Sequence, residues 1–318
     1  MYNEPIFLQP VFQEKIWGGD KLKTVYNYDI PSEQTGEAWV ISAHPNGPSV
    51  IENGPLKGKT LKDAWELHGE LFNKSADNND AYPLLVKILD ANDDLSVQVH
   101  PDDAFAREME GVPYGKTECW YILDAKPGSE LILGHHAKTK RELEQMMAGG
   151  EWEELLRRVK VRPGDFVYVP SGTIHAIGKG IVILETQQSS DTTYRVYDYD
   201  RTDADGNKRE LHLEKAAAVT NVPHQIPKLK QEEVVSGDLA MTKLVENDYF
   251  GVSRWKLTGR VEQTMASEFL QVSVIEGQAL LTVSDKPFEI KKGTHFILPH
   301  GIGQYELSGE AEFVVSWV

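Results

Sequence analysis

The chain has 318 residues, of which 40% are hydrophobic and 26% charged, and this composition excludes disordered, collagen-like and low-complexity fibrous classes. Its 33 basic and 49 acidic residues give a net charge of −16, which opposes broad electrostatic binding to nucleic acid or anionic lipid. The single cysteine, Cys119, excludes an intrachain disulfide and a cysteine-based zinc site. The length favours two domains or one large all-β unit.

The sequence also bears on the compartment. The first twenty residues lack the basic start and apolar core of a secretory signal. No later stretch approaches the roughly 18 apolar residues of a spanning helix. We therefore expect a cytoplasmic protein without a membrane or nucleic-acid partner, and the oligomeric state is left open.

Short β-branched and aromatic runs between turn residues predict a mainly β protein. These runs occupy residues 84–89, 95–100, 165–170 and 180–187. Helices are expected only as short insertions. Thr60 and Asp63 form a capping pair before one helix, and Thr139 and Glu142 form another before a helix that ends near Gly150.

An internal repeat is the most informative feature of the chain. Residues 164–175 read GDFVYVPSGTIH and residues 293–304 read GTHFILPHGIGQ, with a glycine, a proline and a second glycine at the same spacing. His175 ends the first copy, and Gln304 stands at the matching place in the second. Turn residues at fixed places around an apolar strand predict that each copy delivers its last side chain to a fixed position.

The repeat is typical of cupin jelly rolls. We therefore expect a mainly β protein with two cupin-type jelly-roll barrels and short helical insertions, in which the second barrel is degenerate. The polar, proline-containing stretch 221–233 is the expected joint. Residues 1–233 would form a catalytic cupin domain with helical insertions, and residues 234–318 a degenerate C-terminal cupin domain.

Two polar rows follow from the alternation of side chains along a strand. The rows are Ser96, Gln98 and His100 in one strand, and Lys116, Glu118 and Trp120 in another. Cys119 points to the opposite face, so we expect a packed thiol there.

Together with His175, these rows provide a candidate metal site. Its four members are Gln98, His100, Glu118 and His175. A single histidine is more often structural, but these groups together would bury several charges at a high cost without a metal. The donors suit Zn²⁺ with an open position, and a site with two histidines and one carboxylate suits Fe(II) equally.

A polar segment, ETQQSSDTTYRVYDYDR, follows at residues 185–201. Arg195, Tyr197 and Tyr199 are expected to share one strand face. Arginine is well shaped for bidentate contact with a phosphate, so Arg195 and Arg201 favour an anionic ligand. Pairing of these arginines with neighbouring aspartates is an equally good interpretation.

Several segments carry a resemblance to a known family. They are SVQVHP, KTECWYIL, GDFVYVPSGTIHAIGKG and ETQQSSDTTYRVYDYDR, with IWGG at 16–19 and GEAWVISAHPNGPS at 36–49. In this order they resemble the type I mannose-6-phosphate isomerases, in the short form of Gram-positive bacteria. The resemblance spans nearly the whole chain. It implies interconversion of mannose 6-phosphate and fructose 6-phosphate through an enediol, without the extra helical domain of the longer form.

The resemblance also implies roles for individual residues. The zinc ligands, for one Zn²⁺ per chain, would be Gln98, His100, Glu118 and His175. Arg195 would be the catalytic arginine, and the substrate pocket would be lined further by Ser96, Lys116, Glu185 and Arg201. The proton-transferring base is left open among Glu185, Lys116 and zinc-bound water. The cation that meets the phosphate is left open between Arg201 and Lys116.

Two other functional classes are compatible with the same ligands. A non-haem iron cupin dioxygenase would need no phosphate-binding cation. A non-catalytic sugar-binding cupin would lack enediol-forming partners beside the metal, a place where we expect Lys116, Glu185 and Arg195. Four residues that could stack on a sugar are more often core residues and are left outside the site: Trp17, Trp39, His44 and Trp120.

Overall fold

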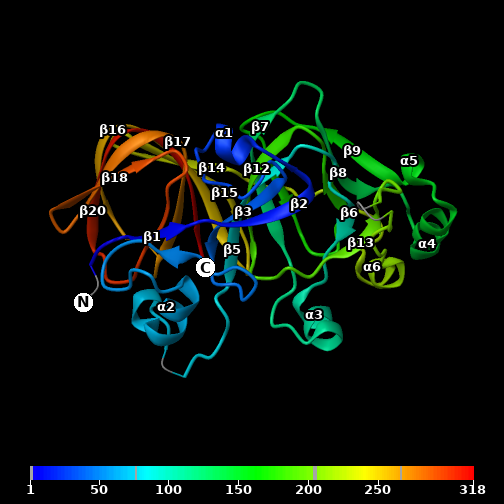
Figure 1. Cartoon of the computed structure of the whole chain (residues 1–318), viewed down its shortest axis with the longest axis horizontal. Helices are drawn as coiled ribbons and strands as arrows, with labels where there is room; N and C mark the ends of the chain where they lie inside the picture. The colour runs from blue at the N-terminus through cyan, green and yellow to red at the C-terminus, as the bar shows by residue number, and fades with distance from the viewer. Residues whose placement is uncertain (1–2, 76, 203–205, 266) are drawn as a thin grey trace.

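A computed structural model describes residues 3–75, 77–202, 206–265 and 267–318 of the chain. Two β-sheet units lie side by side along the long axis of the molecule (Figure 1). The first unit holds most of the green strands, and the second holds the orange and red strands of the C-terminal part. The protein is thus mainly β, as the sequence predicts.

Two antiparallel sheets form the first unit. The six-stranded sheet has the order β10-β7-β12-β5-β3-β2, and the five-stranded sheet has the order β13-β6-β11-β8-β9. The strands of the larger sheet are β2 (Val11–Gly19), β3 (Thr35–Ser42), β5 (Leu84–Ala91), β7 (Glu118–Ala125), β10 (Phe166–Val169) and β12 (Ile181–Gln188). Those of the smaller sheet are β6 (Val97–Val99), β8 (Glu130–His135), β9 (Leu156–Lys160), β11 (His175–Ile177) and β13 (Tyr194–Tyr197). Side chains from both sheets, such as Trp120 and Ile177, share one apolar core.

The second unit is a nine-stranded sheet that draws strands from both ends of the chain. Its strands are β1 (Ile6–Gln9), β4 (Val50–Ile51), β14 (Glu232–Ser236), β15 (Leu239–Glu246), β16 (Gly251–Thr264), β17 (Leu270–Val283), β18 (Lys286–Lys291), β19 (His295–Leu298) and β20 (Gln304–Trp317). β1 pairs with β19, with Ile6 opposite Ile297, and β4 pairs with β1. The predicted division after residue 233 falls inside β14 and leaves out the contribution of β1 and β4 to this sheet.

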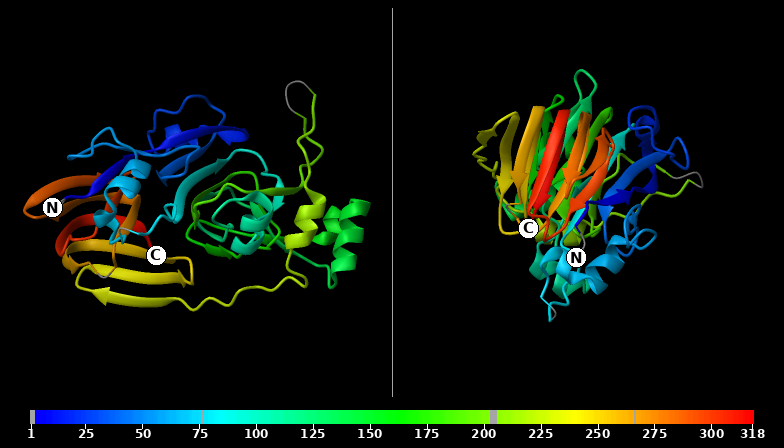
Figure 2. Two further views of the ribbon diagram at one scale, coloured as in Figure 1. Left: turned by 90° about the horizontal axis from the view of Figure 1, so that it is seen from below. Right: turned by 90° about the vertical axis from the view of Figure 1, so that its left-hand side faces the viewer.

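The helices are short and lie outside the sheets (Figures 1 and 2). They are α1 (Lys21–Thr24), α2 (Leu61–Leu67), η1 (Gly69–Phe72), α3 (Asp103–Glu110), α4 (Lys140–Gly149), α5 (Trp152–Leu155) and α6 (Leu213–Val219). Both predicted caps are confirmed: Thr60 and Asp63 form a full capping box, and the side chain of Thr139 accepts a hydrogen bond from the backbone NH of Glu142. Among the described residues, no helix has the length and apolar character needed to cross a bilayer.

Strand alternation gives the six-stranded sheet two different faces. On β7, Cys119 and Tyr121 belong to a core shared with residues of the second unit such as Val252 and Phe250, whereas Glu118 and Trp120 point the other way, into the first unit. The thiol of Cys119 is 1% exposed, which confirms the packed thiol. The outer face of this sheet therefore packs on the second unit, and its inner face is free to carry polar groups.

Both copies of the repeat have the same local structure. β10 and β19 are the apolar strands, and β11 and β20 begin at His175 and Gln304, the last residues of the two copies. The second glycine of each copy has a positive φ, 79° at Gly172 and 93° at Gly301, as the turn requires. His175 is buried and Gln304 is exposed, so the second copy keeps the turn and lacks a buried ligand.

We expect Gly172→Ala to lower the free energy of unfolding by about 2 kcal/mol or more, because alanine is strained at a positive φ and its Cβ would also meet neighbouring atoms. A Cβ at this position would lie 2.4 Å from the Asn221 amide and 2.8 Å from the Val219 carbonyl oxygen. Gly128→Ala is the matched control: its φ is 88° and no atom lies within 4 Å of the new Cβ. Urea unfolding of both variants measures the difference, and equal losses would contradict the steric argument.

Candidate functional site

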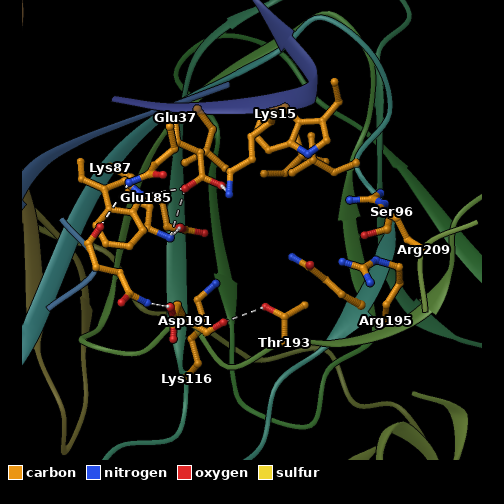
Figure 3. A pocket seen from close by; sticks show the side chains of 18 residues that line it. Lys15, Glu37, Lys87, Ser96, Lys116, Glu185, Asp191, Thr193, Arg195 and Arg209 are labelled. Carbon is orange, nitrogen blue, oxygen red and sulfur yellow. Dashed lines mark hydrogen bonds and ion pairs between the residues drawn. The ribbon is translucent and has the colours of Figure 1, made fainter. Parts of the chain in front are cut away.

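A polar cavity of about 410 Å³ lies between the two sheets of the first unit (Figure 3). Five residues predicted for the site line it: Ser96, Gln98, Lys116, Glu185 and Arg195. They come from both sheets and from the loops beside β6 and β7. The volume lies in the range of sites for small metabolites.

Beneath this cavity, the structure brings three predicted metal ligands together. Their ligand atoms, from His100, Glu118 and His175, all lie within 4.8 Å of one another, and each residue is at most 1% exposed. Nε2 of His100 lies 3.6 Å from Oε2 of Glu118, and Nε2 of His175 lies 3.2 Å from Oε1. Residues from β7 and β11 and the residue after β6 thus converge on one point.

Hydrogen bonds on the far side of each ring fix the tautomer. Nδ1 of His100 lies 2.8 Å from the Thr192 carbonyl oxygen, and Nδ1 of His175 lies 2.8 Å from the Thr173 carbonyl oxygen. A carbonyl only accepts, so each Nδ1 carries the proton and each Nε2 turns its lone pair toward Glu118. Burial lowers the pKa of His175 to about 4 and that of His100 well below its usual value, so both rings are neutral at pH 7.

The carboxylate at the centre of this cluster has one charged partner, Lys116. Both Oε atoms of Glu118 are buried and lack a hydrogen-bond partner among the described residues, although the Lys116 ammonium forms an ion pair with Oε2 at 2.7 Å. Two imidazole lone pairs and a carboxylate therefore face one another inside the protein, an arrangement that a divalent cation would stabilise.

Gln98 supplies the amide that the sequence predicts beside the cluster. The register pairs Gln98 with His175, and the Gln98 amide nitrogen lies 3.4 Å from Nε2 of that ring. A half-turn of the amide presents its oxygen instead. The donor set of two imidazoles, one carboxylate and one amide oxygen fits Zn²⁺ or Fe²⁺.

Lys116 lies next to the cluster and also lines the cavity. Its Nζ is 3.2 Å from Nε2 of His100 as well as 2.7 Å from Glu118. Burial disfavours the ammonium, but the carboxylates of Glu118 and Glu185 outweigh it and raise the pKa of Lys116. The lysine is therefore a cation at neutral pH, which suits donation of a hydrogen bond rather than abstraction of a proton.

Glu185 lies on the inner face of β12 with two fixed partners. Its Oε1 accepts a hydrogen bond from the Trp120 indole at 3.0 Å, and its Oε2 lies 3.6 Å from Nζ of Lys87. Burial, followed by the charge of Glu118, raises the pKa of Glu185. A carboxylate with a raised pKa is a stronger base, which suits proton transfer near neutral pH.

Two charged residues that sequence reasoning missed complete this wall. Lys87 also lies 3.7 Å from Glu37, and both residues line the cavity. Burial works against ionisation of Glu37, but Lys87 and Lys15 outweigh it and lower its pKa to about 2. The available signal was one lysine within the apolar run LLVKIL at 84–89, because a charge is rarely buried without a partner.

Arg195 enters the cavity, but the expected face shared by Arg195, Tyr197 and Tyr199 is wrong. Arg195 pairs with Gln98, whereas Tyr197 pairs with Val97 because a bulge interrupts the register between them. The extra residue turns Tyr197 to the opposite face, where it packs in the apolar core with Tyr199. Arg195, Gln98 and His175 consequently lie on three neighbouring strands.

The structure does not bring Arg201 to the cavity. Its guanidinium donates to Asp198 at 2.6 Å and to the Asp94 carbonyl oxygen, and it is not among the described lining residues. Arg209 lines the cavity instead. Arg209 lies beyond the motif on which the prediction was based, so no local signal pointed to it.

The aromatic residues divide between cavity and core. Trp17 and Trp39 line the cavity, although the predicted site excludes them because such residues are more often core. Trp120 is fully buried and holds Glu185, and His44 packs edge-on against Trp39. The cavity therefore has an indole wall as well as charged walls.

Comparisons with known proteins agree along the whole chain. The family model described as the catalytic domain of type I phosphomannose isomerase matches residues 6–118, and that of the mannose-6-phosphate isomerase cupin domain matches residues 240–318. The mannose-6-phosphate isomerase ManA of Bacillus subtilis (strain 168) is 53% identical to this chain over 99% of both. The mannose-6-phosphate isomerase of Streptococcus mutans serotype c is 51% identical over 98% of both.

A solved structure of a relative has the same fold as this chain. The crystal structure of the mannose 6-phosphate isomerase from Bacillus subtilis has a TM-score of 0.95 and 51% identity, with 99% of each chain covered. The predicted fold class, two cupin-type barrels in a mainly β chain, is confirmed. The chain belongs to the type I phosphomannose isomerase family.

Proposed function

We propose that this protein interconverts mannose 6-phosphate and fructose 6-phosphate through an enediol, with one Zn²⁺ per chain. The proposed ligands are Gln98, His100, Glu118 and His175. The observation that carries the proposal is the buried group of two neutral imidazoles and one carboxylate directly beneath a charged cavity. The names of the 51% and 53% identical relatives support the reaction, and the single cysteine supports a cytoplasmic location.

The reaction moves a proton between C2 and C1 of the open-chain sugar and shifts negative charge onto the carbonyl oxygen. When bound, the metal supplies positive charge that stabilises this oxygen or orders the sugar hydroxyls. The ammonium of Lys116 lies beside the same cluster and donates a hydrogen bond to an oxygen that becomes negative. The burial of the cluster keeps water away and strengthens these interactions.

Within the chain, Glu185 is the group best suited to take and return the proton. It lines the cavity, and its raised pKa and its hydrogen bond from Trp120 give a positioned, basic carboxylate. Lys116 is held as a cation and is assigned the role of a charged hydrogen-bond donor to the sugar oxygens. Arg195, which shares a row of strands with Gln98 and His175, stabilises the developing enediolate, and Ser96 binds a sugar or phosphate oxygen.

A coupled assay of the purified protein tests the reaction. We expect turnover of mannose 6-phosphate and none of mannose, because binding of the remote phosphate contributes to transition-state stabilisation. A chelator is expected to abolish turnover and added Zn²⁺ to restore it. Consumption of O₂ during turnover would instead identify a dioxygenase, and binding without turnover would identify a sugar-binding protein.

We expect His100→Ala to lower the affinity for the metal by about 10-fold or more and to lose isomerase activity with the metal. His136→Ala, at an exposed position, is the control that should keep both the metal and the activity. Retention of metal by His100→Ala would remove His100 from the ligand set.

Glu185→Gln keeps the shape of the side chain and an oxygen for the Trp120 hydrogen bond, and we expect it to lower kcat by about 10²- to 10⁴-fold. In the unmodified protein, kcat/KM should fall as the pH drops, because protonation removes the base. The raised pKa of Glu185 places the midpoint of this loss above the ordinary value of 4.5. A kcat within twofold of the parent for Glu185→Gln would exclude the base assignment.

Arg195→Ala should keep its metal and lose about 100-fold or more in kcat, since the lost interaction forms mainly in the transition state. Metal analysis and steady-state kinetics of the same preparation separate the two quantities. Arg195→Lys keeps the charge but loses the two parallel donors of the guanidinium, so its kcat should lie between those of the parent protein and Arg195→Ala. An unchanged kcat in Arg195→Ala would take this residue out of the mechanism.

A further inference from the structure

Two arginines lie on the side of the cavity opposite the carboxylates. Figure 3 shows Arg195, Arg209 and Ser96 together there, across the cavity from Lys87 and Glu185. Arg195 donates to the Glu210 carbonyl oxygen at 2.8 Å, and its buried Nε has no hydrogen-bond partner among the described residues. In a chain of net charge −16, a half-buried arginine that forms no ion pair with a carboxylate among the described residues favours an anionic ligand.

Arg209 is held from behind by a single carboxylate. Its Nε donates to Oδ2 of Asp198 at 2.8 Å, and its Nη2 donates to Oδ1. The hydrogen bonds that Arg209 donates to described residues come from Nε and Nη2, and the residue lines the cavity. The guanidinium is thus fixed along one edge and has donors left for a ligand.

Arg201 shares this carboxylate but turns elsewhere. Its Nη2 lies 2.6 Å from Oδ1 of Asp198, and its Nη1 donates to the Asp94 carbonyl oxygen. Asp198 is 5% exposed; burial opposes its ionisation, but Arg209 and Arg201 outweigh it and lower its pKa. The two arginines outnumber the one carboxylate that they share, which leaves positive charge beside this end of the cavity.

We propose that Arg209 binds the phosphate of the substrate, and that Asp198 is a positioning residue that holds the Arg209 guanidinium for this contact. This inference rests on the proposed function. A phosphate monoester carries close to two negative charges and matches the fork of an arginine. The site is remote from Lys116 and Glu185, as a C6 phosphate must be from the reacting C1 and C2. Arg201, which the resemblance places at the substrate, is assigned to anchoring Asp198.

Kinetics of Arg209→Ala tests the assignment. We expect KM for mannose 6-phosphate and the inhibition constant of inorganic phosphate to rise together by about 10- to 100-fold, with a smaller change in kcat. Arg209→Lys should recover part of the loss.

Two further variants serve as comparisons. Arg201→Ala removes a cation bound to the same carboxylate and should raise KM and the inhibition constant less than Arg209→Ala does. Arg260→Ala, at an exposed ion pair with Glu306 in the second unit, is the control that should leave both unchanged. A larger loss in Arg201→Ala, or unchanged constants in both Arg209→Ala and Arg209→Lys, would overturn the inference.

Asp198→Asn tests the positioning role by the sign of its effect. Loss of a negative charge beside the arginines would tighten phosphate binding by charge alone, whereas loss of the anchor would weaken it. We expect weaker binding, and tighter binding would overturn the positioning role.

Titration of inorganic phosphate into the protein, measured by calorimetry, is independent of turnover. Phosphate binding that depends on Arg209 in a protein without isomerase activity would refute the proposed function and keep the anion site. Isomerase activity with phosphate binding that does not depend on Arg209 would support the proposed function and refute the assignment of the phosphate to Arg209.

Discussion

The two hydrogen bonds from imidazole Nδ1 atoms to the backbone carbonyls of Thr192 and Thr173 determine the chemistry of the cavity floor. They place the proton of each ring on the side away from Glu118 and leave both Nε2 lone pairs directed at its carboxylate. Without these contacts the rings could rotate or change tautomer, and one of them could donate to Glu118 and satisfy it. Two imidazole lone pairs and the Glu118 carboxylate thus stay buried together beside the Lys116 ammonium, an arrangement that a bound divalent cation would stabilise further.

The fold holds the two histidines and Glu118 in place through a backbone hydrogen bond and through packing against the second unit. The backbone NH of Gly172 donates to the His100 carbonyl oxygen, so the turn that delivers His175 is tied directly to the other histidine. Glu118 lies on the inner face of a sheet whose outer face packs on the second unit. That unit keeps the repeated turn with Gln304 exposed in place of a buried histidine, and it contributes packing rather than ligands. Pairing of β1 with β19 ties the start of the chain into the same support.

Charge is distributed unevenly around the cavity. On the wall formed by the six-stranded sheet, Glu37 and Glu185 lie on either side of Lys87, so opposite charges stabilise one another inside the protein. Buried networks of this kind contribute little net stability, and their value lies in fixing groups for chemistry. On the other wall, the arginines outnumber their carboxylate partner. A substrate that carries its negative charge at one end is oriented by this difference before any reaction begins.

Much of the candidate metal site could be predicted from local sequence patterns. Alternation along a strand correctly grouped Gln98 with Ser96 and separated Glu118 from Cys119, and the repeat located the turn before His175. These predictions hold because a regular strand fixes which side of the sheet each residue faces. The tertiary structure decided the rest. A bulge reversed Tyr197, a property of strand pairing that one strand's sequence does not show. The choice of Arg209 over Arg201 depends on where two arginines around one aspartate point in space, and Lys87 entered the site because the pairing of β5 with β12 places it opposite Glu185.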